Sequence, residues 1–158
     1  MLGAAATGAM QRKVGETEIA SLVDRTAVAE NAWVRGEMER YLSLISHSDD
    51  YTLMSPFGGA PRRGFDTSPA RLAELSRFFH GGSGTVELVQ SYSAESMVVL
   101  ALILRMRAAV GGLPEQDWSL RVTQIYRRDV AVWRLVHRHA DPLLGKIGLD
   151  QAAALARG

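Results

Sequence analysis

Residues 118–142, WSLRVTQIYRRDVAVWRLVHRHADP, decide the fold, because they indicate two β-strands joined by a short turn. The first strand is rich in residues that favour strands, namely Val122, Thr123, Ile125 and Tyr126. Strict alternation along the second strand predicts two faces, one with Trp133, Leu135, His137 and His139 and one with Val132, Arg134, Val136 and Arg138. Two histidines about 6 to 7 Å apart on one face are the most open candidates for chemistry.

Upstream of this hairpin the sequence predicts further strands over residues 85–94 and 97–110. Residues Met97 to Met106 are apolar at both odd and even positions, which is typical of a strand that is covered on both faces. One cover is the core of the domain. We expect the other to be a second subunit, so that the protein is a homodimer formed through the sheet.

The N-terminal half is helical by its apolar spacing. A first helix from Glu16 is interrupted at Gly36, and a second continues to Ile45 before residues 47–50 end it. A short strand over residues 51–55 stops at Pro56, and a loop bearing Arg62 and Arg63 follows. Ser68-Pro69 begins a third helix, which Gly81-Gly82 closes, and residues 143–157 contain a short terminal helix.

Composition limits the class of protein. The chain of 158 residues is 47% hydrophobic, enough for one domain, which we place at residues 15–142 between a mobile tail (1–14) and a C-terminal extension (143–158). A net charge of +1 disfavours a nucleic-acid partner, and the longest apolar run, Met97 to Leu104, is too short to cross a membrane. Arg12 and Lys13 follow the apolar first ten residues, the wrong order for a signal peptide, so we expect a cytoplasmic protein.

The order of these elements resembles the cone-shaped α+β fold of nuclear transport factor two, ketosteroid isomerase and the SnoaL-like polyketide cyclases. Three segments are similar to that group: AWVRGEMERYLSLI (32–45), YTLMSPFGGAPRRGFD (51–66) and RRDVAVWRLVHRHAD (127–141). The last is also similar to the association domain of calcium/calmodulin-dependent kinase two. The resemblance implies a curved mixed or antiparallel sheet wrapped on three N-terminal-half helices, with a small-molecule pocket inside. Val130-Ala131 replaces the usual glycine, which predicts a turn that is not left-handed.

The catalytic residues of ketosteroid isomerase have no counterparts in this sequence. The resemblance places Ser55 where that enzyme has its carboxylate base, Ala29 where it has a tyrosine, and Thr123 where it has a protonated acid. A serine hydroxyl is not a base near neutral pH. Ketosteroid isomerisation is therefore disfavoured.

The remaining candidates for chemistry are His139 and Glu30. Histidine titrates near neutral pH, and Glu30 lies in the middle of the apolar arc of the first helix, where a carboxylate must be paired, protonated or exposed to a cavity. We expect Glu30 to pair with Arg121 or to hydrogen-bond His139; a salt bridge at the helix edge is the alternative. By the resemblance, Arg121 and Thr123 face the pocket, where an arginine favours an anionic group.

Further residues expected to line the pocket are His137, Ser55, Trp33, Phe57, Tyr92 and Trp133. The alternative for the histidines is a structural hydrogen bond, and for the aromatic residues an ordinary place in the core. A metal site is disfavoured, because His137 and His139 lack an evident third ligand, and no cofactor is expected.

We therefore expect a SnoaL-like protein that binds a small, largely apolar ligand with one polar or anionic end. Whether it acts on that ligand by acid–base chemistry is open. The competing hypothesis is a non-catalytic oligomerisation module.

Overall fold

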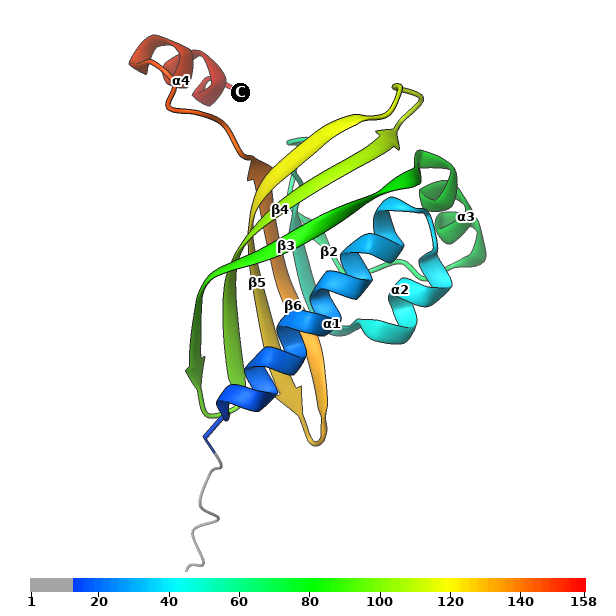
Figure 1. The fold of residues 1–158 in the computed structure, drawn as a ribbon, viewed down its shortest axis with the longest axis vertical. Helices are drawn as coiled ribbons and strands as arrows, with labels where there is room; N and C mark the ends of the chain where they lie inside the picture. The colour runs from blue at the N-terminus through cyan, green and yellow to red at the C-terminus, as the bar shows by residue number, and fades with distance from the viewer. Residues whose placement is uncertain (1–12) are drawn as a thin grey trace, which may run out of the picture.

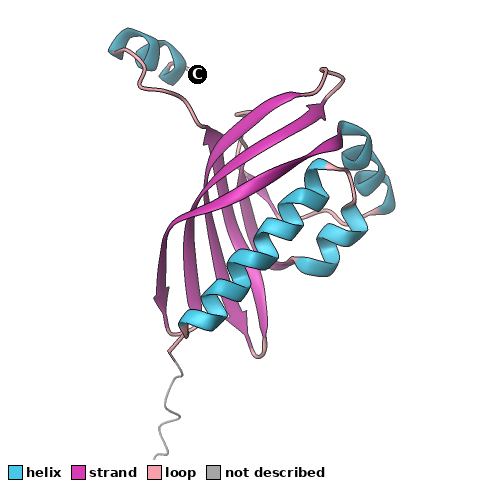
Figure 2. Ribbon diagram, in the orientation of Figure 1, coloured by secondary structure: helices cyan, strands magenta, loops and turns pink. Residues whose placement is uncertain are grey.

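The computed structural model describes residues 13–158, and in that range the chain forms four helices and one six-stranded mixed sheet (Figure 1). The helices are α1 (Glu16–Val34), α2 (Met38–Leu44), α3 (Pro69–Phe78) and α4 (Leu149–Ala156). The strands are β1 (Ser46–Met54), β2 (Arg62–Arg63), β3 (Phe79–Ala94), β4 (Met97–Val110), β5 (Gln116–Asp129) and β6 (Val132–Pro142). The expected α+β class with its helices mainly in the N-terminal half is confirmed (Figure 2). Of the tail expected over residues 1–14, residues 1–12 lie outside the described residues. Val14, which is described, is buried.

The strand order is β2-β1-β6-β5-β4-β3, with β1 parallel to β6 and all other neighbours antiparallel. The sheet curves around α1, which crosses its inner face obliquely with α2 alongside (Figure 1). The core fills the space between α1 and the inner face, with Leu22 and Ala29 from the helix against Leu100, Leu102 and Leu104 from β4. No helix among the described residues is long and apolar enough to cross a membrane.

Gly36 ends α1 in the way that its sequence position predicts. It has a φ of +74°, and the Gly36 and Glu37 N–H groups donate to the carbonyls of Trp33 and Ala32, which closes the helix in a Schellman-type turn. A Cβ at this position would lie 2.4 Å from the Phe79 carbonyl oxygen. The glycine therefore also allows the start of β3 to pack directly against the α1–α2 junction.

Two boundaries differ from the sequence prediction. Residues 47–50 belong to β1 rather than ending a helix, because β1 pairs with β6 from Ser46 onward. Gly81 and Gly82 lie inside β3, and α3 already ends at Phe78. Backbone pairing with β4 thus extends the strand through the two glycines, both at positive φ. The N-terminal cap of α3 is as expected: the Ser68 hydroxyl accepts a hydrogen bond from the Arg71 N–H.

The prediction for the β5–β6 turn was wrong. Val130 adopts a φ of +55°, so the turn is left-handed at this residue although it is β-branched. The side chain of Val130 is 96% exposed, so no packing contact holds it there. The ten residue pairs that join β5 to β6 hold the two strand ends together and impose this conformation on the turn.

A β-bulge in β6 decides which side chains face the interior. Leu135 pairs with Tyr126 and His137 with Ile125, so Val136 has no partner in β5. Trp133 and Leu135 face the core before the bulge, but after it the alternation is shifted by one residue. Arg138 and Ala140 therefore face inward, and His137 and His139 face outward.

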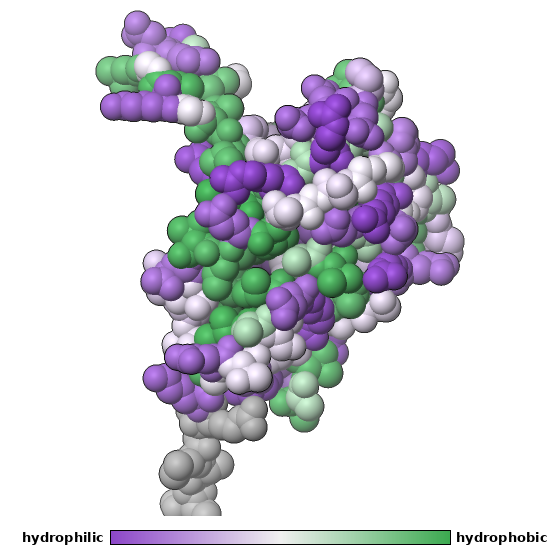
Figure 3. All heavy atoms as spheres, viewed as in Figure 1, coloured by the Kyte–Doolittle hydropathy of each residue, from purple (hydrophilic) through white to green (hydrophobic). Residues whose placement is uncertain are grey.

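The terminal helix α4 stands apart from the body of the protein (Figure 1). None of its side chains is buried, and Leu149 is 85% exposed. In the space-filling view, hydrophobic residues of this helix lie open at the surface, and others gather over the strands beside α1 (Figure 3). α4 is thus an amphipathic element without a packing partner in this conformation.

Candidate functional site

A cavity of about 970 Å³ lies between the inner face of the sheet, α1, α3 and the segment that joins β1 to α3. Its walls are mainly apolar and include the aromatic residues Trp33, Tyr41, Tyr51, Phe65, Phe79 and Trp118. Glu30, at one end, is only 6% exposed, whereas Phe57, also in the lining, is 56% exposed. The cavity therefore runs from an aromatic mouth at Phe57 to a charged floor at Glu30.

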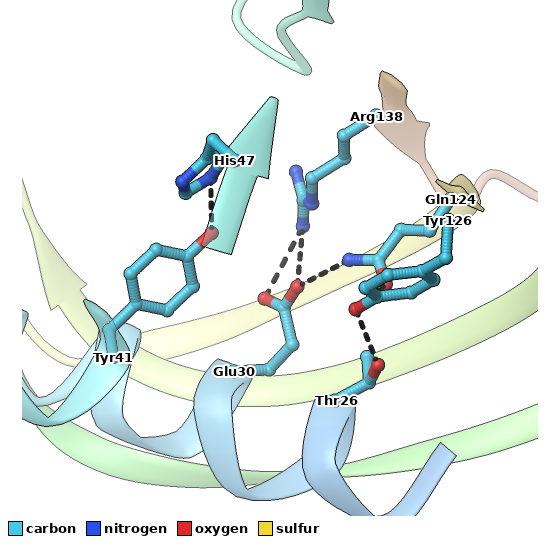
Figure 4. A network of polar contacts seen from close by, with 7 residues as sticks. All are labelled: Thr26, Glu30, Tyr41, His47, Gln124, Tyr126 and Arg138. Carbon is cyan, nitrogen blue, oxygen red and sulfur yellow. Dashed lines mark hydrogen bonds and ion pairs between the residues drawn. The ribbon is translucent and has the colours of Figure 1, made fainter. Parts of the chain in front are cut away.

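Glu30 and Arg138 form an ion pair at this floor (Figure 4). The Nη2 atom of Arg138 lies 3.3 Å from both carboxylate oxygens of Glu30, and both side chains are largely buried. Gln124 Nε2 donates to Glu30 Oε1 at 3.1 Å. Breaking such a buried pair leaves an uncompensated charge, so each residue requires the other.

A chain of hydroxyl groups fixes the orientation of Gln124. Because the amide NH₂ of Gln124 donates to Glu30, its Oε1 is free to accept, and the Tyr126 hydroxyl donates to it at 3.2 Å. The Thr26 hydroxyl, 2.9 Å away, then donates to Tyr126 (Figure 4). Burial raises the pKa of Tyr126 to about 12, so this phenol stays protonated near neutral pH. Each hydrogen bond in this series, from Thr26 through Tyr126 and Gln124, is therefore donated in the direction of the Glu30 carboxylate.

Two phenol groups in the cavity wall add hydrogen-bond donors. Burial raises the pKa of Tyr51 to about 12 and that of Tyr41 well above its usual value. The Tyr41 hydroxyl lies 3.1 Å from Nε2 of His47, whose ring stacks on Phe65 at a centroid distance of 4.0 Å. Burial lowers the pKa of His47 to about 4, so this imidazole is neutral near pH 7. Both phenols therefore stay protonated.

Three donor groups in the lining, two on Arg138 and one on Trp118, have no partner in the described part of the chain. Arg138 makes its side-chain hydrogen bonds through Nη2, and its Nε and Nη1 groups have no partner among the described residues. The indole Nε1 of Trp118 is buried and likewise without a partner in the described part of the chain. A buried donor without a partner, such as Nε1 of Trp118, is costly, and a bound molecule with acceptor atoms could accept hydrogen bonds from both residues.

Four of the expected pocket residues line this cavity, namely Glu30, Trp33, Ser55 and Phe57. The Ser55 hydroxyl accepts a hydrogen bond from the Phe57 N–H, which shapes the turn at the mouth. Trp33 contacts Tyr41 edge to face, at a centroid distance of 4.8 Å. These four residues therefore form part of the cavity wall.

Four others lie on the opposite face of the sheet, which corrects the sequence expectation. Arg121 pairs with Asp141, and Thr123 is the strand neighbour of exposed His139. His137 Nδ1 is 2.7 Å from the Thr52 hydroxyl, and its pKa is lowered by burial and by the nearby His139. Arg121 and Thr123 alternate with the inward-facing Leu120, Val122 and Gln124, and the bulge at Val136 turns the two histidines outward.

Tyr92 and Trp133 also lie outside the cavity. Tyr92 is 61% exposed on β3, and Trp133 is a core residue whose indole Nε1 donates to Glu18 at 3.0 Å. Arg128 stacks over the Trp133 ring at 5.0 Å and pairs with the same Glu18 carboxylate. This cluster fastens the start of α1 to the β5–β6 hairpin.

Arg138 is the site residue that the sequence pattern did not predict. Uninterrupted alternation placed it opposite His137 and His139, and nothing in the sequence marks Val136 as a bulge. One signal was available: a carboxylate in the apolar arc of a helix must be paired, protonated or exposed to a cavity, and Arg138 is a candidate cation on the last strand. No group of three or more possible metal-binding side chains occurs among residues 13–158.

No protein-family model matches the sequence, and a search of curated proteins finds no match. Solved structures are similar in fold. A candidate scytalone dehydratase from Novosphingobium aromaticivorans superposes with a TM-score of 0.65 over 84% of this chain and 90% of its own, at 11% identity. The CaMKII hub homology domain of Chlamydomonas reinhardtii has a TM-score of 0.59 (80% and 98% covered, 17% identity). An NTF2-like protein of unknown function in nutrient uptake from Rhodospirillum rubrum has a TM-score of 0.56 (80% and 98% covered, 20% identity). At these identities the similarity establishes the fold alone.

Proposed function

Because the chain has the cone-shaped fold of the nuclear transport factor two-like (NTF2-like) superfamily, we propose that it is a SnoaL-like protein that binds a small, largely apolar molecule with one polar or anionic end. The aromatic walls of the cavity would enclose the apolar part. The polar end would lie at the floor beside Arg138. This proposal moves the polar contact from Arg121, which lies on the other face, to Arg138.

The unsatisfied donors of Arg138 are the observation that carries the proposal. Its side chain is 14% exposed and lines the cavity, yet Glu30 engages only Nη2. An arginine that keeps donors directed at an apolar cavity favours a carboxylate, carbonyl or other acceptor on the bound molecule. The buried Nε1 of Trp118 offers a second donor nearer the mouth.

Stabilisation by ligand binding tests this proposal. We expect screening against aromatic and alicyclic carboxylates and ketones to yield compounds that raise the melting temperature, because a molecule that binds only the folded state stabilises it. The double variant Glu30→Gln/Arg138→Met, in which the buried charges are removed together, should lose this response. Arg121→Met, which removes an arginine on the outer face, is the matched control and should keep it. Equal loss in both variants, or no stabilising compound at all, would contradict the proposal.

Acid–base chemistry on the bound molecule is a second activity that the floor supports. Glu30 is a carboxylate at the cavity wall, and the protonated phenol of Tyr51 is a donor for an oxyanion that forms near it. With a compound from the screen as substrate, Glu30→Gln should abolish turnover and retain binding. His139→Ala should leave turnover unchanged, because His139 lies on the opposite face. Turnover that survives Glu30→Gln would exclude Glu30 as the base.

Assembly through the outer face of the sheet is the competing function. Half-buried apolar residues form a strip there: Val99, Ala101, Ile103 and Ile125. Ion pairs border the strip, including Arg105–Glu87, Arg121–Asp141 and Arg127–Asp50. An apolar centre within a charged rim is typical of a subunit interface, so we propose a homodimer formed through this strip. Ile103→Arg should then give monomers by light scattering, whereas the cavity-floor variant Glu30→Gln/Arg138→Met should remain dimeric; a monomeric wild-type protein would contradict the dimer.

A further inference from the structure

The mouth of the cavity has an exposed aromatic cluster, formed by Phe57, Phe78 and Trp118. The Phe57 ring packs edge to face against Phe78 at 5.9 Å and against Trp118 at 6.1 Å between centroids. Phe57 is nonetheless 56% exposed and Phe78 38% exposed. This aromatic rim is therefore an apolar surface that the described chain leaves uncovered.

The chain leaves β6 directly at this rim. Pro142 pairs with Leu120, and the Leu143 N–H donates to the carbonyl of Ser119 at 2.8 Å, next to Trp118 in sequence. Pro142 and Leu143 themselves line the cavity. The segment that leads to α4 thus begins at the rim cluster.

The connection between Leu143 and α4 is short and able to turn. Residues 144–148 span at most about 17 Å when fully extended. Because this linker begins at Leu143 in the cavity lining, the start of α4 stays close to the mouth. A Cβ added to Gly145 or Gly148 would meet no atom within 4 Å, so neither glycine is held by neighbouring chain. Rotation about these glycines changes the direction of α4 without breaking any described contact.

One face of α4 is suited to an aromatic surface. At 100° per residue, Leu149, Ala152, Ala153 and Ala156 lie within one arc, and Leu155 extends it on one side. The alanines allow the helix backbone to approach flat rings closely. Asp150 lies at the edge of this arc, and the rim has two exposed arginines, Arg62 and Arg63, whose side chains have no partner among the described residues.

We propose that α4 is a lid that folds over the aromatic rim of its own chain and closes the ligand cavity. The lid would bury Leu149 against Phe57 and Phe78 and bring Asp150 to Arg62 and Arg63. The role of this closure, to enclose a ligand, rests on the proposed function. Docking of α4 does not, because it is expected in the protein without ligand. The conformation with α4 extended is then the open state, through which a ligand enters.

Disulfide trapping tests docking directly, since the chain has no cysteine of its own. The pair Ala153→Cys and Glu74→Cys joins the apolar face of α4 to α3 at the rim, where Glu74 is exposed and lines the cavity. We expect oxidation to give an intramolecular disulfide at least tenfold faster than in the control pair Ala153→Cys and Gln90→Cys, whose second cysteine lies on β3 across the sheet. Leu149→Ser should reduce this advantage. Equal rates in both pairs, or a disulfide that joins two chains, would overturn the proposal.

The release of a fluorescent apolar probe separates the lid from the cavity. N-phenyl-1-naphthylamine fits the aromatic lining by its chemistry, and its dissociation rate is measured by stopped-flow dilution. Deletion of residues 144–158 should raise that rate at least fivefold, and Leu149→Ser should raise it in the same direction. Failure of the probe to bind at all would count against the cavity proposal and leave the disulfide result to decide the lid. An unchanged dissociation rate with bound probe would overturn the lid.

Discussion

Arg138 and Glu30, 108 residues apart in the chain, form the one ion pair among the described residues that lies at the floor of the cavity. Arg138 reaches this position only because the bulge at Val136 turns it inward. The pair gives the cavity a charged floor and couples the last strand to the first helix. Its two partners should therefore be strongly coupled in stability.

Removing one partner of this pair should destabilise the fold far more than removing both. Arg138→Met leaves the carboxylate of Glu30 buried with only Gln124 as a partner, which should cost about 3–5 kcal/mol in the free energy of unfolding. Glu30→Gln/Arg138→Met should recover most of that loss. Urea denaturation of the four proteins in the double-mutant cycle measures the coupling, and additive effects would contradict a direct interaction.

Gly36→Ala should be strongly destabilising. The alanine would combine a φ of +74° with a Cβ only 2.4 Å from the Phe79 carbonyl oxygen, so β3 or the α1–α2 junction must move. Gly58 has the same φ and open space around it, so Gly58→Ala isolates the conformational cost of about 1–2 kcal/mol. Thermal unfolding should show a clearly larger loss for Gly36→Ala. Equal losses would mean that the contact with Phe79 is unimportant.

Val130→Asn should stabilise the protein by about 1 kcal/mol. Asparagine adopts a positive φ at a lower cost than a β-branched residue, and an exposed Val130 has no packing to lose. Ala131→Asn, at the next residue, is the control for a general effect of asparagine in the turn. The midpoint of urea denaturation should rise for Val130→Asn alone, and a fall would show that Val130 is not strained.

His47 should make the protein less stable as the pH falls from about 6.5 to 4. Its pKa is about 4 in the folded protein and about 6.5 when unfolded, so the unfolded chain binds more protons in this window. Stability due to His47 is therefore complete above pH 6.5 and declines toward pH 4, by about 3 kcal/mol in total. His47→Gln should flatten this part of the stability profile, measured by urea denaturation at a series of pH values. An unchanged slope in the variant would assign the pH dependence to other groups.

The sequence by itself determined the elements and the burial of Glu30. Apolar spacing of 3.6 residues identified the helices, alternation and β-branched residues identified the long strands, and Gly36 and Ser68 marked helix ends through local backbone chemistry. These features depend on neighbours in the chain, so a linear pattern contains them. For the same reason Glu30 was identifiable as a carboxylate on the buried face of a helix.

Only the tertiary structure decided which residues the cavity contains. The bulge at Val136 arises from the pairing of β6 with β5, and a shift of one residue reverses every following side chain. It placed Arg138 beside Glu30 and sent His137 and His139 to the outer face. The left-handed Val130 has the same origin, since strand pairing on both sides of the turn outweighs the local preference of one residue. The partner of a buried charge and the face of a strand depend on contacts distant in sequence, which no local pattern specifies.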